Sequence, residues 1–276
     1  MYPDQIYTPE VRMSRLCATD ARAAYQANPV ILVPMGSHED QGPHFPMGDY
    51  LFAERIAELA AVAATQAGTP TFVAPVIPYG GEDFFRSAKG GIVIEQSTLE
   101  LILMDVMNSL IANGLTRIVL VNGHSGNVNP IAVTIRKIHQ QHGVVVPSIY
   151  LWECAYRLLP QRVGAQEAAR RAGHGADPLG SVGLHLHPEL VRSEYRPQQM
   201  PTRLDPVFGK SFTNLGKIAF GSVEFGVPYD YADTYNAGVA TGDPHLCDAE
   251  TGAWLTGELV DGLVGMCSAM GAAAQG

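Results

Sequence analysis

Short, mainly apolar runs alternate along the chain with longer segments whose apolar residues recur at helical spacing. The runs comprise residues 29–35 (PVILVPM), 71–77 (TFVAPVI), 117–121 (RIVLV) and 144–151 (VVVPSIYL). Their length and their β-branched residues favour strands that are buried on both faces. The pattern therefore predicts four buried strands.

Each of the first three runs is followed, after a polar loop, by a segment with helical periodicity. These segments cover residues 51–67, 97–113 and 129–141. In the second segment, Ser97 and Glu100 predict an N-cap with a capping box. Strands that alternate with helices are typical of βαβ units, so the sequence predicts an α/β fold with a mostly parallel sheet covered on both faces.

Length and composition fit one globular domain that spans all 276 residues, with 46% hydrophobic and 16% charged residues. We expect an N-terminal arm with a short helix over residues 1–28 and a core over about residues 29–265. The Gly- and Ala-rich residues 270–276 predict a loose tail.

The net charge limits the classes of partner that we expect, and the cysteines indicate the cellular compartment. A net charge of −9 without a cluster of basic residues argues against nucleic acids and against anionic membrane surfaces. The four cysteines lie far apart and form no CxxC pair, which favours reduced thiols in the cytoplasm. No apolar stretch of membrane-spanning length and no signal peptide is visible in the sequence, so a cytoplasmic protein is expected.

The loop after the first predicted strand concentrates metal-binding residue types. Residues 36–49 contain two histidines, one glutamate and two aspartates, namely His38, Glu39, Asp40, His44 and Asp49. Carboxylate oxygens combined with imidazole nitrogens suit Zn²⁺ or Mn²⁺. An ordinary solvated polar loop is the alternative interpretation of the same residues.

Two further histidines are candidates because of where the predicted fold places them. His124 follows the third strand, and the loops after parallel strands gather at one edge of the sheet, where ligand sites form. His174 lies in a Gly-rich turn and could act as a general acid or base. Each could instead be a hydrogen-bonded structural histidine. Ser125 lacks the frame of a nucleophile elbow.

Four segments together resemble the creatininase (creatinine amidohydrolase) family. They are VPMGSHEDQGPHFPMGD at 33–49, GLTRIVLVNGHSGN at 114–127, GHGADPLGSVGLHLHPELV at 173–191 and, more weakly, GVATGDPHLCDAETG at 238–252. The resemblance implies a single-domain three-layer α/β/α sandwich. It also implies hydrolysis of C–N bonds in cyclic or linear amides, with some members acting on formamides, peptides or ring ketones. Two divalent metals and a homo-oligomer, commonly a hexamer, are further implications.

The resemblance assigns roles to individual positions of this sequence. Glu39, Asp49 and His124 match the ligands of the first metal, if one residue is deleted between Pro46 and Asp49. His174 matches the catalytic histidine of the third motif.

The ligands of the family's second metal are replaced. Gln41 stands where the family has histidine, Leu179 where it has glutamate, and Gly126 where creatininase itself has glutamate. Leucine cannot ligate a metal, and a neutral amide binds Zn²⁺ weakly. One site is therefore expected, and a second site is either lost or rebuilt from residues such as His38, Asp40, His44 or Asp177.

The positions that form the creatinine pocket also differ, with Arg170 and Ser125 in place of aromatic residues. We therefore expect a substrate other than creatinine. The hypothesis is a hydrolase of an amide, cyclic or otherwise small, in which a metal-activated water attacks and His174 transfers the proton. Glu39 is expected to take part in catalysis as a metal ligand. Ser125, Glu82, Asp83 and Arg86 are candidates to bind the small-molecule substrate.

Two alternatives remain open from the sequence. Ring opening of a cyclic ketone or lactone would need the same metal and water. A catalytically silent relative that binds a small molecule would explain the altered second site, although it would have no physical need for Glu39, Asp49, His124 and His174 together.

Overall fold

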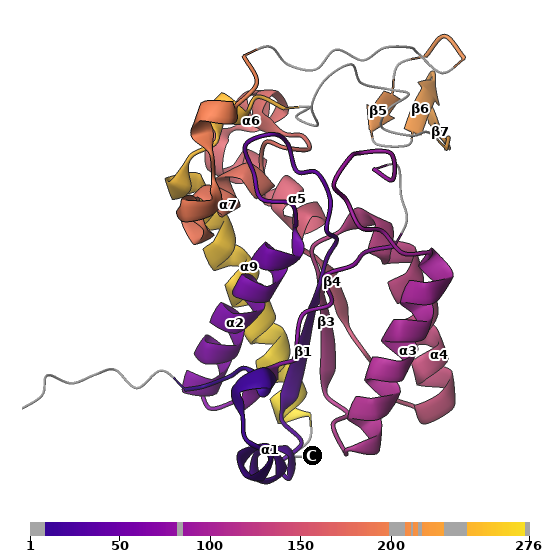
Figure 1. Cartoon of the computed structure of the whole chain (residues 1–276), viewed down its shortest axis with the longest axis vertical. Coiled ribbons are helices and arrows are strands. Elements are labelled where there is room, and N and C mark those ends of the chain that lie inside the picture. Colours follow the sequence, from indigo (N-terminus) through magenta and orange to yellow (C-terminus); the bar gives the residue numbers. More distant parts are fainter. Residues whose placement is uncertain are drawn as a thin grey trace, which may run out of the picture.

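A four-stranded parallel sheet forms the centre of the molecule (Figure 1). The computed structural model describes residues 9–81, 85–198, 208–210, 212–214, 217–228 and 242–273. Across the sheet the strand order is β2-β1-β3-β4, with β1 Val30–Met35, β2 Thr71–Val73, β3 Ile118–Asn122 and β4 Ser148–Tyr150. The chain passes from β1 to β2 on one side of β1 and then continues to β3 on the other side. At such a reversal the loops that follow β1 and β3 diverge, which leaves a crevice between them at the edge of the sheet.

The register brings the ends of the two central strands together. β1 and β3 pair from Ile31 opposite Ile118 to Met35 opposite Asn122. Every residue of both strands is buried, as expected for a parallel sheet covered on both faces. The chain therefore leaves β1 and β3 at neighbouring points of the same edge.

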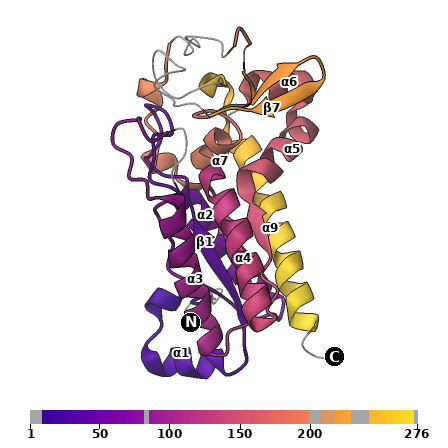
Figure 2. The ribbon, with the colours of Figure 1, turned by 90° about the vertical axis from the view of Figure 1, so that its right-hand side faces the viewer.

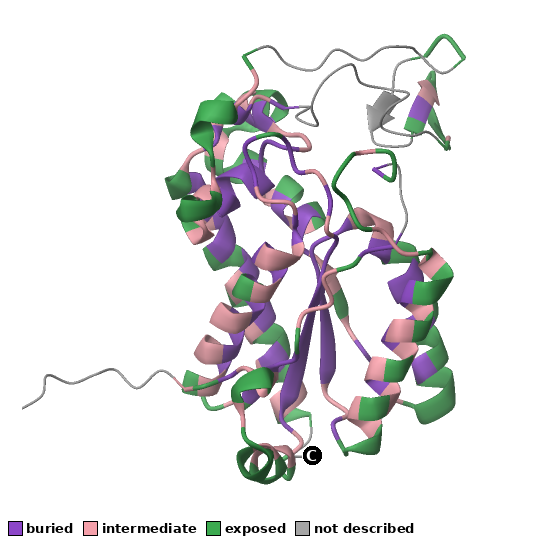
Figure 3. Cartoon of the chain, viewed as in Figure 1, coloured by how far each residue is buried: buried purple, intermediate pink, exposed green. Residues whose placement is uncertain are grey.

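Helices cover both faces of the sheet (Figure 2). One face packs against α2 (Tyr50–Gln66), α5 (Leu151–Val163), α7 (Leu179–Leu186) and α9 (Ala249–Ala272). The other packs against α3 (Gln96–Ala112) and α4 (Val128–His142). The buried residues lie between these layers, and the exposed residues lie on the outer sides of the helices (Figure 3).

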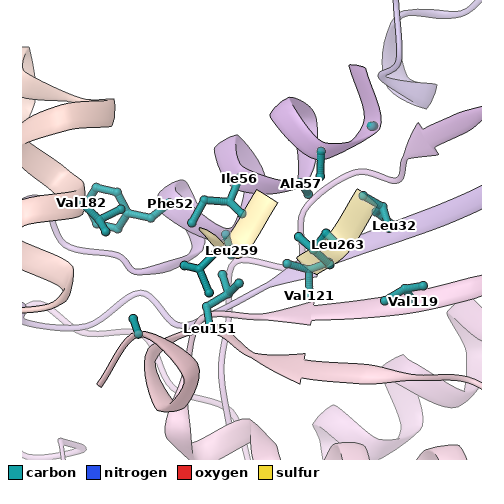
Figure 4. Close-up of a cluster of buried hydrophobic side chains, with 14 of the residues drawn as sticks. Leu32, Phe52, Ile56, Ala57, Val119, Val121, Leu151, Val182, Leu259 and Leu263 are labelled. Atoms are coloured by element: carbon teal, nitrogen blue, oxygen red, sulfur yellow. The ribbon is translucent and has the colours of Figure 1, made fainter. Parts of the chain in front are cut away.

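The larger of the two cores joins segments that are far apart in sequence (Figure 4). Leu32 of β1 and Val121 of β3 contribute to the same buried cluster as Phe52 of α2, Val182 of α7 and Leu259 of α9. Removal of this apolar surface from water supplies most of the driving force for folding. The C-terminal helix α9 is thus an integral part of the core.

The remaining elements are short. Before β1 lie η1 (Met13–Arg15) and α1 (Ala18–Tyr25), and α6 (Ala165–Arg171) follows α5. A small antiparallel sheet, drawn at the top of Figure 1, consists of β5 (Phe212–Asn214), β6 (Lys217–Phe220) and β7 (Val223–Gly226). Besides η1, the described residues contain the 3₁₀ turns η2 (Ser125–Asn127), η3 (Pro188–Leu190), η4 (Ser193–Tyr195) and η5 (Pro244–Leu246).

The structure confirms the α/β/α sandwich and its mostly parallel sheet, and it corrects several boundaries. The predicted capping box is wrong, since α3 has Glu95 as its N-cap and no side chain caps it. A β-bridge between Gly81 and Ile94 fixes the chain just before the helix, so tertiary contacts set its start. The fourth strand is shorter than predicted and gives way to α5 at Leu151.

The loose tail predicted from residue 270 begins too early, because α9 continues to Ala272. Met270 packs against the larger core, and the backbone of Gly271 lies close to Thr69. These contacts stabilise the last helical turn. Within the described residues, no helix combines the length and the apolarity that a lipid bilayer requires.

Candidate active site

The loop that leaves β1 brings Asp49 to the start of α2. Asp49 is the N-cap of this 17-residue helix, and the backbone N–H of Ser37 donates to its Oδ1 at 2.7 Å. A Cβ atom on Gly36 would lie 2.3 Å from the same oxygen, so only glycine permits this approach. The partial positive charge at the start of α2 stabilises the carboxylate.

Glu39 and Asp49 meet His124 at the edge of the sheet. Nδ1 of His124 lies 3.2 Å from Oε2 of Glu39 and 3.2 Å from Oδ2 of Asp49. The three residues are 1–2% exposed, and each offers one ligand atom within 4.8 Å of the others. The three first-metal positions that the resemblance indicated therefore form one compact buried cluster.

This cluster fits a divalent cation. Two carboxylates that lie together in a buried place repel each other, and burial of each charge is costly without a compensating cation. Two oxygen donors with one imidazole match the ligand preferences of Zn²⁺ and Mn²⁺. Three protein ligands also leave room for a substrate or a water molecule, as in catalytic metal sites.

Two asparagines of the NGHSGN segment build the frame of the site. Asn122 accepts the backbone N–H of His124 at 3.0 Å and donates to the His124 carbonyl at 2.7 Å. Asn127 donates to the Gly36 carbonyl and to Asn122 Oδ1, each at 3.1 Å, and accepts the Gly81 N–H at 2.8 Å. These bonds join the loops after β1, β2 and β3, so Asn122 and Asn127 hold the position of His124.

The positions of the family's second metal are filled in other ways. The Gln41 amide donates to Glu39 Oε1 at 2.7 Å. Leu179 is 7% exposed and places an apolar side chain against the cleft. At Gly126 the backbone carbonyl accepts a bond from Gln96 Nε2 at 3.5 Å.

The residues considered for a rebuilt second site lie elsewhere. Asp177 accepts a bond from Arg171 Nε at 2.7 Å, and Asp40 Oδ1 accepts the N–H of Gly42 at 2.8 Å. The His38 ring lies 6.3 Å from that of Tyr50. His44 is completely buried against Phe45, and burial lowers the pKa of its imidazole to about 4. In the described part of the chain, none of these four residues joins a group of three metal ligands.

His174 reaches the same cleft from a different part of the chain. Nε2 of His174 lies 2.6 Å from the carbonyl oxygen of Asp40, and its ring centroid lies 4.0 Å from that of Phe85. The cleft is lined by Glu39, Asp49 and His124 of the cluster and by Gln41, Phe85, Ser125, Tyr150, Trp152, Tyr156, Gly173, His174, Gly175, Pro178 and Leu179. The third sequence motif therefore lies beside the carboxylate–imidazole cluster.

Four aromatic residues of the cleft wall were missed by the sequence analysis, namely Phe85, Tyr150, Trp152 and Tyr156. The last three lie at the end of β4 and in the first two turns of α5, hence at the same edge as the other loops. The sequence does contain a signal for these three residues, because they lie at or just after the end of the fourth predicted strand, and ligand sites form where parallel strands end. Burial raises the pKa of Tyr150 far above its ordinary value, so its hydroxyl stays a neutral hydrogen-bond donor.

The predicted substrate-binding residues have different positions. Ser125 lines the cleft. Arg86 is 57% exposed and pairs with Glu95 at 3.8 Å, and it is not part of the cleft wall. Glu82 and Asp83 lie outside the described residues. Arg170, at a creatinine-pocket position by resemblance, pairs with Glu167 on the exposed side of α6.

The fold is an α/β/α sandwich of the creatininase type, and its buried cluster of Glu39, Asp49 and His124 has the ligand types that could hold a divalent metal ion. The sequence model of the creatininase family, described as creatinine amidohydrolase, matches residues 14–267, so the chain belongs to the creatininase family. It is accordingly a hydrolase of the amidohydrolase type.

Two relatives with sequence similarity are named mycofactocin precursor peptide peptidase. The chain is 37% identical over 129 residues to the mycofactocin precursor peptide peptidase of Mycolicibacterium smegmatis, a match that covers 44% of this chain and 50% of that protein. It is 30% identical over 171 residues to the protein of the same name from Mycobacterium ulcerans, covering 60% and 62%. The chain thus matches less than two thirds of the length of either relative.

Solved structures confirm the creatininase fold. A creatininase mutant described as the Zn-Zn type superimposes with a TM-score of 0.71 at 20% identity, covering 93% of this chain and 96% of that one. A structure described as creatininase Mn gives the same TM-score, identity and coverage. At this level of identity, the likeness extends to the fold alone.

Proposed function

We propose that the protein is a metal-dependent hydrolase that cleaves an amide C–N bond in a peptide or in a cyclic amide. The observation that carries the proposal is the buried cluster of Glu39, Asp49 and His124, which opens into the same cleft as His174. A metal-ligand set beside a titratable imidazole in one concave site is the arrangement expected of a hydrolase.

The ligands of the proposed metal are Glu39, Asp49 and His124, and the ion is Zn²⁺ or Mn²⁺. When bound, such an ion polarises a substrate carbonyl and increases the acidity of water. One ion per chain is proposed, because Gln41 donates to Glu39 and Leu179 offers no ligand atom. Glu39 contributes to catalysis because it is one of the proposed ligands of this ion.

His174 is proposed to move the proton between the attacking water and the leaving nitrogen. A carbonyl oxygen can only accept a hydrogen bond, so the contact with Asp40 places a proton on Nε2 of His174. Nδ1 is then the nitrogen that gains and loses the transferred proton. Contact with the Phe85 ring restricts rotation of the imidazole, which favours a fixed geometry for proton transfer.

Several observations support a peptide or another amide rather than creatinine. The relatives with sequence similarity are named as peptidases. Two positions that are aromatic in the family's creatinine pocket hold Ser125 and Arg170 here, and of these two residues Ser125 lines the cleft. The aromatic wall at Tyr150, Trp152 and Tyr156 instead offers apolar surface and hydroxyl donors to a larger substrate.

Ring opening of a cyclic ketone or lactone, and a catalytically silent role in binding a small molecule, are the competing functions. We further propose a homo-oligomer in the cytoplasm. The exposed Phe220, Val223 and Phe225 of the small sheet support assembly, because a three-stranded sheet with exposed apolar faces is stabilised by packing.

The experiment is elemental analysis of protein purified without chelator, combined with turnover of four probes. The probes are a linear peptide amide, a cyclic amide, creatinine and a lactone. We expect about one Zn or Mn per chain, lost in Glu39→Ala and His124→Ala, and retained in the control His139→Ala, an exposed histidine of α4. His174→Ala should keep the metal and lose activity on the order of 10²–10⁴-fold.

Other outcomes separate the alternatives. Turnover of the lactone without either amide would favour ring opening. About two ions per chain would mean that a second site has been rebuilt. No metal, with no activity after Zn²⁺ or Mn²⁺ is added, would exclude the hydrolase and favour the silent binder.

A further inference from the structure

The loop that carries His174 is closed at its base by backbone bonds between its two ends. The N–H of Asp177 donates to the Arg171 carbonyl at 3.1 Å, and the N–H of Gly173 donates to the Asp177 carbonyl at 2.9 Å. A β-bridge joins Ala172 and Asp177 in the same place. His174 therefore lies on a short loop whose conformation depends on how residues 171 and 177 are held.

The guanidinium of Arg171 binds three side chains from separate segments. Nε donates to Asp177 Oδ2 at 2.7 Å, and Nη2 donates to Asp248 Oδ2 at 2.7 Å and to Ser181 Oγ at 3.3 Å. Arg171 is 5% exposed and Asp177 is fully buried. A buried cation between two carboxylates is held firmly only while every hydrogen bond is made.

The acceptors of Arg171 are themselves fixed to the starts of two helices. Asp177 Oδ1 accepts the N–H of Ser181 in the first turn of α7, at 2.9 Å. Asp248 is the N-cap of α9, and its Oδ1 accepts the N–H of Thr251 at 2.7 Å. Although burial by itself raises the pKa of Asp248, the bonds from Thr251 and Arg171 bring that pKa below its ordinary value. Asp248 is thus held in its charged form.

None of Arg171, Asp177 and Asp248 lines the cleft. The network reaches the cleft wall through the loop between residues 171 and 177, which carries His174, and through Pro178 and Leu179 at the start of α7. On the side of the cleft, His174 contacts the Asp40 carbonyl and the Phe85 ring. The loop is thus held between the Arg171 network and the wall of the cleft.

We infer that Arg171 is a positioning residue that sets the place of His174 against the Glu39–Asp49–His124 cluster, by tying the His174 loop to α7 and α9. This inference rests on the proposed function, which gives His174 the proton transfer. Lysine at position 171 keeps the charge but is a single point donor, so it cannot bind Asp177 and Asp248 through a planar fork. The His174 imidazole should then be displaced and more mobile.

The first test is chemical labelling, which needs neither substrate nor metal turnover. Diethyl pyrocarbonate modifies histidines, and peptide mapping gives a rate for each one. In Arg171→Lys we expect the rate at His174 to rise several-fold, while the rates at the buried His44 and His124 stay as in the native protein. The matched control is Arg170→Lys, the neighbouring arginine, which pairs with Glu167 on the surface. A milder second variant is Asp248→Asn, which should raise the His174 rate less.

Two outcomes of the labelling would overturn the inference. One is an unchanged rate at His174 in Arg171→Lys. The other is an equal rise at His174, His44 and His124, which would show a general loss of stability in place of a local effect.

The second test is a double-variant cycle with a peptide p-nitroanilide as the probe amide. Arg171→Lys should lower kcat on the order of 10–10²-fold, because a displacement of about 1 Å costs that much, with KM and metal content close to native. In a His174→Ala background the same substitution should change kcat little, since its effect passes through His174. An equal loss in both backgrounds would overturn the inference.

Failure of the proposed function gives a different result. Native protein that holds no metal and stays inactive after Zn²⁺ or Mn²⁺ is added would reject the hydrolase mechanism, and His174→Ala at the native rate would remove His174 from that mechanism. The labelling rates would still decide whether Arg171 holds His174 in place.

Discussion

The side-chain amide of Gln41 donates a hydrogen bond to Oε1 of Glu39, with 2.7 Å between the two atoms. Gln41 thus orients a proposed metal ligand, although it occupies a position where the family's pattern has a ligand itself. Groups that hydrogen-bond to metal ligands fix their orientation, and their loss costs affinity.

We therefore expect Gln41→Ala to weaken binding of Zn²⁺ on the order of 10–100-fold without abolishing it. Competition with a chelator of known affinity would measure this change. Gln140→Ala on the exposed side of α4 is the control and should leave affinity unchanged. Native affinity in Gln41→Ala would mean that Glu39 is oriented without its help.

Asn127 should be among the most sensitive residues of the frame. Its side chain satisfies the Gly36 carbonyl, the Gly81 N–H and the Asn122 side chain, and it is completely buried. Asn127→Ala removes the partner of the buried Gly36 carbonyl and of the buried Gly81 N–H, at a cost of about 1–3 kcal/mol for each group, whereas Asn122 keeps its bonds to His124. We expect a loss of about 2–5 kcal/mol in the free energy of unfolding, measured by urea denaturation.

The neighbouring Asn129 offers the control for this prediction. It is exposed in the first turn of α4, so Asn129→Ala should change the free energy of unfolding by less than about 0.5 kcal/mol. If both substitutions cost the same, the three-loop frame would not depend on Asn127.

His44 should make the stability of the protein depend on pH. Burial lowers the pKa of its imidazole to about 4, from 6.5 in the unfolded chain. Between these values the unfolded state binds a proton that the folded state does not, so stability falls as the pH falls from 6.5 towards 4. The pKa difference corresponds to about 3 kcal/mol, lost by about pH 4.

The measurement is urea denaturation at several pH values, on chelator-treated native protein and His44→Gln. Glutamine does not titrate, so the variant should lose less stability than the native protein between pH 6.5 and 4. Removal of metal from both proteins keeps the pH-dependent release of a bound ion out of the comparison. Parallel curves for the two proteins would show that His44 does not carry this dependence.

Leu259 tests whether α9 is an integral part of the core (Figure 4). It is 2% exposed and packs in the same cluster as Val121, Phe52 and Val182. Leu259→Ala should lower the free energy of unfolding by about 2–5 kcal/mol, from lost burial and a residual cavity. Leu101→Ala on α3, where the side chain is 66% exposed, should cost far less. Thermal or urea denaturation of Leu259→Ala and Leu101→Ala measures the two losses of stability.

The amino-acid sequence by itself determined the four strands of the parallel sheet, the helices α2, α3 and α4, and the edge at which chemistry gathers. Continuous apolar runs and helical spacing are local signals, because each reflects which side of one element faces the core. Winding rules for parallel strands then placed the loops that carry Glu39, Asp49 and His124 together. The motifs of the family pointed to the same three residues and to His174.

Only the tertiary structure decided which polar residues of those loops face one another. His38, Asp40 and His44 lie in the same loop as Glu39, yet the conformation of that loop turns Glu39 alone among them towards His124. Asp177 pairs with Arg171, and Tyr150 and Trp152 enter the cleft because β4 ends beside β3. Such contacts depend on loop conformation and on hydrogen bonds between residues far apart in the chain, such as Asn127 and Gly36. No periodic pattern encodes them. The sequence therefore indicates the cluster residues and His174, whereas their geometry, their hydrogen-bond partners and the aromatic wall of the cleft follow from the packed fold.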